Sequence, residues 1–131
     1  MAVRIQLNDL KSIRQALAKS QSQMASLLGV SKRAVQSYEQ GWRPTPLHVQ
    51  KIAAMVLFLD WRRNNGPQQP CWEIKGCDPQ RRTCCPAFVL QAGDLCWLVS
   101  GTRCGAPEDI TWERKLPRCQ QCQVTKGMLT R

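Results

Sequence analysis

Eight cysteines lie in the second half of the chain, and the first 70 residues contain none. Thiolates are soft ligands, and this half also lacks histidine, so a metal site here would use sulfur alone. Such a ligand set is typical of tetrahedral zinc or of an iron–sulfur cluster. The N-terminus shows no apolar signal-peptide segment, so we expect a cytoplasmic protein, in which metal binding explains the thiols better than disulfides do. The cysteines are Cys71, Cys77, Cys84, Cys85, Cys96, Cys104, Cys119 and Cys122.

The cysteine spacing differs from that of a plain zinc ribbon, because only Cys119 and Cys122 form a CxxC pair. Five short motifs instead resemble the "two-CW" cysteine-rich module attached to chemoreceptors and other bacterial signalling proteins. They are CWE-x3-C (71–77), CPA (85–87), CW-x3-GT-x-CG (96–105), TW-x2-K (111–115) and C-x2-C (119–122). The resemblance covers residues 71–124 and leaves out Cys84, which is the weakest ligand candidate. We therefore expect zinc or an iron–sulfur cluster on Cys71, Cys77, Cys85, Cys96, Cys104, Cys119 and Cys122.

Residues 71–124 contain few aliphatic side chains, so they cannot build a large apolar core without metals or crosslinks. We expect short strands and turns there, with one helical turn near residues 111–115. Trp72, Trp97 and Trp112 are expected to supply most of the apolar core. An alternative interpretation is that they shield a cluster from solvent and tune its potential.

The first half of the chain contains the helices that would position polar side chains for binding. Residues 20–41 predict two short helices around a tight turn, because apolar residues recur at helical spacing over residues 21–28. Gly29 allows a sharp reversal, and Ser31 is a good N-cap for the second helix. The side chains expected to face outward on that helix are Lys32, Arg33, Gln36 and Ser37. A basic, amide-bearing outer face of this kind is typical of a helix-turn-helix that reads the DNA major groove.

The same stretch resembles the lambda-repressor/Cro (XRE-type) family over roughly residues 7–60, through SQ at 20–21, LGVS at 28–31 and YEQG at 38–41. The resemblance implies that the second helix reaches base edges, with Ala34 against a thymine methyl. It also implies that Arg14 pairs with Glu39. Trp42 and Arg43 lie where such repressors meet the sugar-phosphate backbone, although a Trp42 packed on the bundle is equally compatible. The implied DNA-binding residues are Gln21, Lys32, Arg33, Ala34, Gln36, Ser37 and Arg43.

Two further helices are expected, at residues 8–18 and 46–63. The second is apolar on every face from residue 52 to residue 59, a run too short to span a bilayer. A helix on a protein surface needs only one apolar stripe, so this one must bury a second face. We prefer a homodimer that reads paired half-sites, and the alternative is docking on the cysteine-rich half.

Charge and composition divide the chain. The whole sequence has a formal charge of +10, of which residues 1–64 carry +7, from ten basic and three acidic side chains. Asn, Gly, Pro and Gln at 65–70 are typical of a linker. We expect an all-α helix-turn-helix domain at 1–64, a small irregular metal-binding domain at 71–124 and a tail at 125–131.

These features predict a regulator of transcription that binds double-stranded DNA and whose cysteine-rich domain senses metal or redox state. An alternative is a DNA-binding protein in which a purely structural zinc domain mediates assembly. A third alternative is thiol–disulfide chemistry at Cys119 and Cys122. A lone CxxC without a thioredoxin-like βαβ pattern is poor support for it, so we expect no enzyme.

Overall fold

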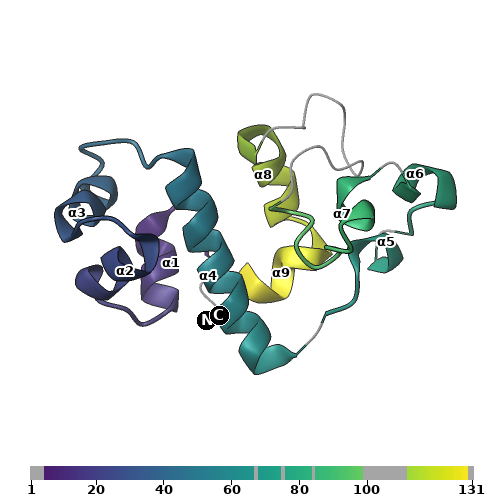
Figure 1. Cartoon of the computed structure of the whole chain (residues 1–131), viewed down its shortest axis with the longest axis horizontal. Coiled ribbons are helices and arrows are strands. Elements are labelled where there is room, and N and C mark those ends of the chain that lie inside the picture. Colours follow the sequence, from purple (N-terminus) through teal and green to yellow (C-terminus); the bar gives the residue numbers. More distant parts are fainter. Residues whose placement is uncertain (1–4, 67, 75, 84, 99–111, 130–131) are drawn as a thin grey trace. The chain divides into compact units, whose positions relative to one another are not determined.

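The computed structural model describes residues 5–66, 68–74, 76–83, 85–98 and 112–129. Over these ranges every regular element is a helix (Figure 1). The chain separates into two compact units. The N-terminal unit comprises Met1–Asn65 together with Met128–Arg131, and the cysteine-rich unit comprises Gly66–Gly127.

The N-terminal unit contains four helices, which are α1 (Leu10–Ala16), α2 (Gln21–Leu28), α3 (Lys32–Gln40) and α4 (Leu47–Asn65). All four expected helices are present, with ends that differ from the prediction by at most two residues. Their core is largely aliphatic, and every helix contributes side chains to it. Its fully buried side chains include Ile13, Met24, Val35, Val49, Leu57 and Phe58.

Local chemistry sets the ends of α2 and α3. Ser20 Oγ accepts a hydrogen bond from the Gln23 N–H at 3.1 Å, and Gln23 Oε1 accepts one from the Ser20 N–H at 2.9 Å, which is a capping box. Gly29 ends α2 in the left-handed conformation at φ 71°, as its position predicted. Ser31 then caps α3 by accepting from the Ala34 N–H at 3.0 Å. Three residues thus reverse the chain between the two helices.

Helix α4 has two different apolar faces. Its buried face consists of Val49, Ala53, Ala54, Leu57 and Phe58. On the other side Ile52 is 39% exposed and Leu59 is 52% exposed, while Met55 and Val56 are half-buried. The second apolar face of α4, which was expected to be buried, is therefore only partly covered by the residues that the structure describes.

Residues 123–129 form a helix, although a tail was expected from residue 125 onward. Helix α9 (Gln123–Leu129) begins in the cysteine-rich unit and ends in the N-terminal unit. Met128 and Leu129 are each 1% exposed, and the Ile5 N–H donates to the Leu129 carbonyl at 2.7 Å. The sequence analysis did not predict this helix, because one i, i+4 apolar pair, Val124 and Met128, is too short a pattern to separate a helix from a tail.

The cysteine-rich unit contains short helices, namely α5 (Cys71–Ile74), α6 (Pro79–Thr83), α7 (Pro86–Val89) and α8 (Trp112–Gln120), followed by most of α9. The expectation of short strands is wrong for the residues that the structure describes. The helical turn expected near residues 111–115 is present as the start of the longer helix α8. Turn residues and prolines limit α5 to α7 to one turn or little more, so they come from tertiary packing rather than from helix propensity.

Tryptophans supply much of the apolar core in this unit, as predicted. Trp97 and Trp112 are 1% and 2% exposed, and their ring centroids lie 6.2 Å apart. Trp72 is half-buried and contacts Phe88 edge-on, with 5.0 Å between ring centroids. The Trp97 indole N–H donates to the Asp94 carbonyl at 3.0 Å, which satisfies its one polar atom.

Candidate nucleic-acid interface

The first turn of α3 presents the charged side chains of the predicted reading helix. Lys32 and Arg33 are exposed, and Gln36 is half-buried. Ala34 and Ser37 are instead 7% and 8% exposed, so both belong to the packed side of α3. The prediction that Ser37 faces outward is wrong. The contact between Ala34 and a thymine methyl stays a prediction, and little of the Ala34 side chain is accessible for it.

The Ser37 carbonyl takes part in the turn that ends α3. It accepts hydrogen bonds from the Trp42 N–H at 3.0 Å and from the Arg43 N–H at 3.4 Å. Gly41 makes this reversal possible, because it adopts φ 79° at the C-cap of α3. The chain therefore folds back against the end of α3 beside Ser37.

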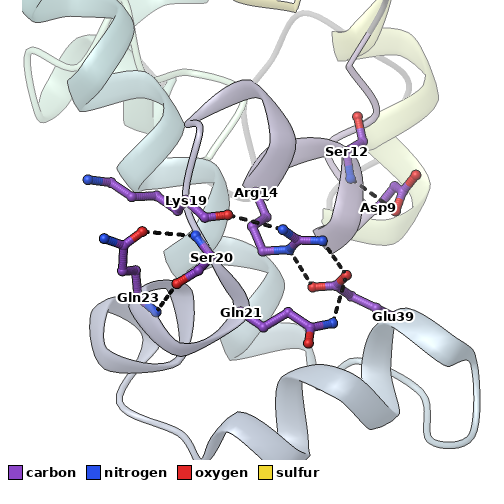
Figure 2. A network of polar contacts seen from close by, with 8 residues as sticks. All are labelled: Asp9, Ser12, Arg14, Lys19, Ser20, Gln21, Gln23 and Glu39. Carbon is purple, nitrogen blue, oxygen red and sulfur yellow. Dashed lines mark hydrogen bonds and ion pairs between the residues drawn. The ribbon is translucent and has the colours of Figure 1, made fainter.

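A bidentate ion pair holds α3 against α1. Arg14 Nε lies 2.8 Å from Glu39 Oε2, and Arg14 Nη2 lies 2.9 Å from Glu39 Oε1 (Figure 2). The Glu39 side chain is 3% exposed, and that of Arg14 is 16% exposed. The predicted pair is thus confirmed, and it is buried on the carboxylate side.

Two further contacts complete this network. Arg14 Nη1 donates to the Lys19 carbonyl at 3.0 Å, close to the start of α2. Gln21 Nε2 approaches Glu39 Oε1 at 3.4 Å, so the first residue of α2 also reaches α3 (Figure 2). The predicted supporting role of Gln21 is consistent with this contact, while its contact with phosphate stays a prediction. Together these bonds fix the orientation of α3 relative to α1 and α2.

The ion pair keeps Arg14 charged. The hydrogen bond to Glu39 raises the pKa of the guanidinium above its ordinary value, Coulombic attraction to Glu39 adds to this, and desolvation opposes it. A raised folded-state pKa contributes stability that is fully present below the unfolded pKa of arginine and is lost only as the pH rises through the higher folded value. Loss of charge on Arg14 therefore does not weaken the pair at neutral pH.

The loop after α3 carries an exposed aromatic residue next to a positioned cation. Trp42 is 75% exposed, so it does not pack on the bundle in this structure. The Arg43 guanidinium carbon lies 5.2 Å from the centre of the Tyr38 ring, within cation–π range. This contact limits the freedom of Arg43 beside the C-terminal end of α3.

The predicted metal ligands differ in how deeply they are buried. Cys96 and Cys119 are buried, and Cys71, Cys77, Cys85 and Cys122 are half-buried. Cys84 and Cys104 lie outside the described residues. Among the residues that are described, no three cysteine, histidine or acidic side chains gather closely enough to hold a metal ion. The described cysteines therefore do not form a metal site by themselves, and metal binding stays a prediction.

The sequence of residues 10–55 matches the family model described as helix-turn-helix, over α1, α2, α3 and the first half of α4. The match supports a DNA-binding regulator and covers less than half of the chain. Comparison with curated proteins found no match, and neither did comparison with solved structures. Within the described ranges, no helix is both long and apolar enough to cross a membrane.

Proposed function

We propose that this chain regulates transcription by binding specific sites in double-stranded DNA through α3. The observation that carries the proposal is the contrast between the two sides of that helix. Its packed side is tied to α1 and α2 by the Arg14–Glu39 pair, while Lys32 and Arg33 are exposed on its first turn. A rigidly held helix with exposed cations at its N-terminal end has the geometry that major-groove reading requires.

The predicted DNA-binding side chains divide into two proposed roles. Lys32, Arg33 and Gln36 would select sequence, because Lys and Arg can bind guanine edges and Gln can bind adenine edges. Gln21 and Arg43 would bind phosphates and set the register of α3. The +7 charge of residues 1–64 favours approach of the N-terminal unit to any nucleic acid.

A homodimer is part of this proposal. Ile52 and Leu59 lie two helical turns apart on α4 and are substantially exposed, with half-buried Met55 and Val56 between them. A second copy would remove this stripe from water and would present two α3 helices to paired half-sites. Analytical ultracentrifugation of the wild type and of Leu59→Glu would test it, and a monomeric wild type at working concentrations would contradict it.

The direct test begins with an operator selected from random duplexes. Arg33→Ala should lose about 1–3 kcal/mol on that operator and relax the preference at one base position. Lys11→Ala is the matched control, because Lys11 is also an exposed cation but lies on α1. The proposal fails if the selection yields no preferred sequence, or if Arg33→Ala and Lys11→Ala bind alike.

For the cysteine-rich unit, we propose zinc or iron–sulfur binding with a sensing role, supported by its sulfur-only donor set and by the burial of Cys96 and Cys119. The competing proposal is structural zinc alone. Anaerobic purification followed by metal and sulfide analysis separates them. A brown protein containing iron and sulfide supports sensing, stoichiometric zinc supports the structural role, and a metal-free folded protein contradicts both.

A further inference from the structure

The CxxC motif at the end of α8 lies in a closed turn of the cysteine-rich unit. Cys119 belongs to the last turn of α8, and Cys122 immediately precedes α9. The Cys122 N–H donates to the Cys119 carbonyl at 3.0 Å. Such a hydrogen bond closes a turn whose first and last Cα atoms are less than about 7 Å apart. In an extended chain the same two atoms would be about 10 Å apart, so the fold, and not the spacing alone, brings the two cysteines together.

This separation suits a disulfide. A disulfide requires a Cα–Cα distance of roughly 4.4–6.8 Å, and a larger separation can be bridged only if the backbone moves. The turn encloses only Gln120 and Gln121, so little chain entropy is lost when its ends are joined. Cys119 and Cys122 are also the only cysteines of the sequence that lie three residues apart.

Thr125 holds both ends of the turn. Its side chain is buried, with 1% of the residue exposed. Its hydroxyl group donates to the Cys119 carbonyl and lies 3.2 Å from the Cys122 carbonyl. The Thr125 N–H and the Lys126 N–H also donate to the Cys122 carbonyl, at 3.2 Å and 3.1 Å. The backbone of the two cysteines is therefore held in the closed turn by hydrogen bonds that do not involve their sulfur atoms.

The two thiols differ in accessibility. Cys119 is 5% exposed, whereas Cys122 is half-buried. Because thiol–disulfide exchange requires access to the attacking sulfur, an external reagent reacts first with Cys122. Cys119 then reacts within the protein, where the closed turn keeps it beside Cys122.

We propose that Cys119 and Cys122 form a reversible disulfide by exchange with a low-molecular-weight disulfide, and that Thr125 is the positioning residue of this pair. The Cys122 sulfur attacks one sulfur atom of the reagent, so that the S–S bond of the reagent breaks and a mixed disulfide forms as the first thiol leaves. The Cys119 sulfur then attacks the Cys122 sulfur and displaces the second thiol. The two released thiols carry the two protons that the cysteines lose. The pair is thus oxidised by two electrons, and the reagent is reduced by two.

This disulfide makes the cysteine-rich unit respond to the thiol–disulfide balance of its surroundings. Transient disulfides in reducing compartments usually serve catalysis or redox sensing. The inference uses only the backbone turn and its two thiols, so it rests neither on DNA binding nor on a bound metal. A chain that binds no DNA would refute the proposed function and leave this pair unaffected.

The test incubates the full chain in buffers of glutathione and glutathione disulfide, blocks the remaining thiols with an alkylating reagent and digests the protein with trypsin. Cleavage after Arg118 and Lys126 releases residues 119–126, which contain Cys119 and Cys122 and no other cysteine. Mass spectrometry of this peptide measures the ratio of disulfide to dithiol. The folded chain should reach a ratio about tenfold or more above that of the same chain in denaturing guanidinium chloride, because folding raises the effective concentration of one thiol at the other.

Single variants test the order of reaction and the role of Thr125. Cys119→Ser should accumulate a mixed disulfide between glutathione and Cys122, whereas Cys122→Ser should leave the buried Cys119 largely unmodified. Thr125→Val keeps the shape of the side chain but removes its hydroxyl group, and it should lower the ratio of disulfide to dithiol by about fivefold. Thr125→Ser should restore most of the ratio. Gln123→Ala, the matched control, changes an exposed neighbour and should leave the ratio unchanged.

Each contrary result would overturn one part of the proposal. A folded chain that stays dithiol in buffers that oxidise the unfolded chain would show that the turn does not bring the thiols together. A disulfide from either cysteine to a different one would refute the pairing, and equal modification of the two serine variants would refute the order of reaction. If Thr125→Val and Thr125→Ser lower the ratio equally, the hydroxyl group does not position the pair. The comparison of folded and unfolded wild type decides the pairing even where a Thr125 variant fails to fold.

Discussion

The two units differ in the length of their helices and in the residue types of their cores. In the N-terminal unit, four helices of seven to nineteen residues contribute aliphatic side chains to one core, and Ser20 and Ser31 cap two of them. In the cysteine-rich unit, α5, α6 and α7 have four or five residues each, and the core consists largely of tryptophan and cysteine. Isolated helices this short are not stable in water. The helices α5 to α7 of the second unit must therefore be stabilised by tertiary contacts.

The largest expected effect is the response to metal removal. If metal binding holds residues 71–124 together, a chelator should unfold this unit and leave α1 to α4 intact, because a metal site does not exist in the unfolded chain. Limited proteolysis should then cut within residues 71–124 while the N-terminal unit survives. A chelator-treated protein that resists protease throughout would show that metal does not hold the unit together.

The next effect concerns the buried ion pair of the N-terminal unit. Glu39→Ala leaves the partly buried Arg14 guanidinium without its carboxylate and should lower the free energy of unfolding by about 3–5 kcal/mol. Asp60→Ala is the matched control, because it breaks the pair between Asp60 and Arg63, whose arginine side chain is 76% exposed. That control should cost about 1 kcal/mol or less. Equal shifts in the thermal midpoint for the two variants would contradict the special position of the Arg14–Glu39 pair.

A smaller effect is expected at Gly93 in the cysteine-rich unit. A Cβ on this residue would lie 2.5 Å from Pro70 Cβ and 2.9 Å from the Trp72 ring, and the Cys71 N–H donates to the Gly93 carbonyl at 3.0 Å. Gly93→Ala should lower the free energy of unfolding by about 1–3 kcal/mol, because the added methyl group overpacks the site. The loss of stability should appear in this unit alone.

The matched control for Gly93 is Gly29→Ala. A Cβ added to Gly29 would meet no atom within 4 Å, but Gly29 has a positive φ of 71°. Gly29→Ala should therefore lose stability through backbone strain, and the loss should appear in the N-terminal unit. Amide exchange resolved by unit would distinguish the two variants. An unchanged cysteine-rich unit in Gly93→Ala would mean that Pro70 and Trp72 do not pack against Gly93 as the structure shows.

Residue types and their spacing along the chain were sufficient to predict most of the structure of the N-terminal unit. Gly29 and Ser31 predicted the turn between α2 and α3, because a positive φ and an N-cap hydrogen bond are local requirements. The Arg14–Glu39 pair was also foreseen, through the resemblance to the repressor family, and the structure confirms it. Lys32 and Arg33 are exposed on α3 as predicted, whereas Ser37 is buried, because the width of the packed side of α3 is set by tertiary contacts and not by residue type.

Tertiary structure decides the helices of the cysteine-rich unit and the position of residues 128–129. The core tryptophans of the cysteine-rich unit could be identified from the sequence. Its short helices could not, because segments of four or five residues carry too little periodicity to separate a helical turn from a loop. The docking of Met128 and Leu129 beside Ile5 joins residues more than 120 positions apart in the chain. Such a contact leaves no local pattern, because its free energy comes from burying apolar surface that only the folded N-terminal unit provides.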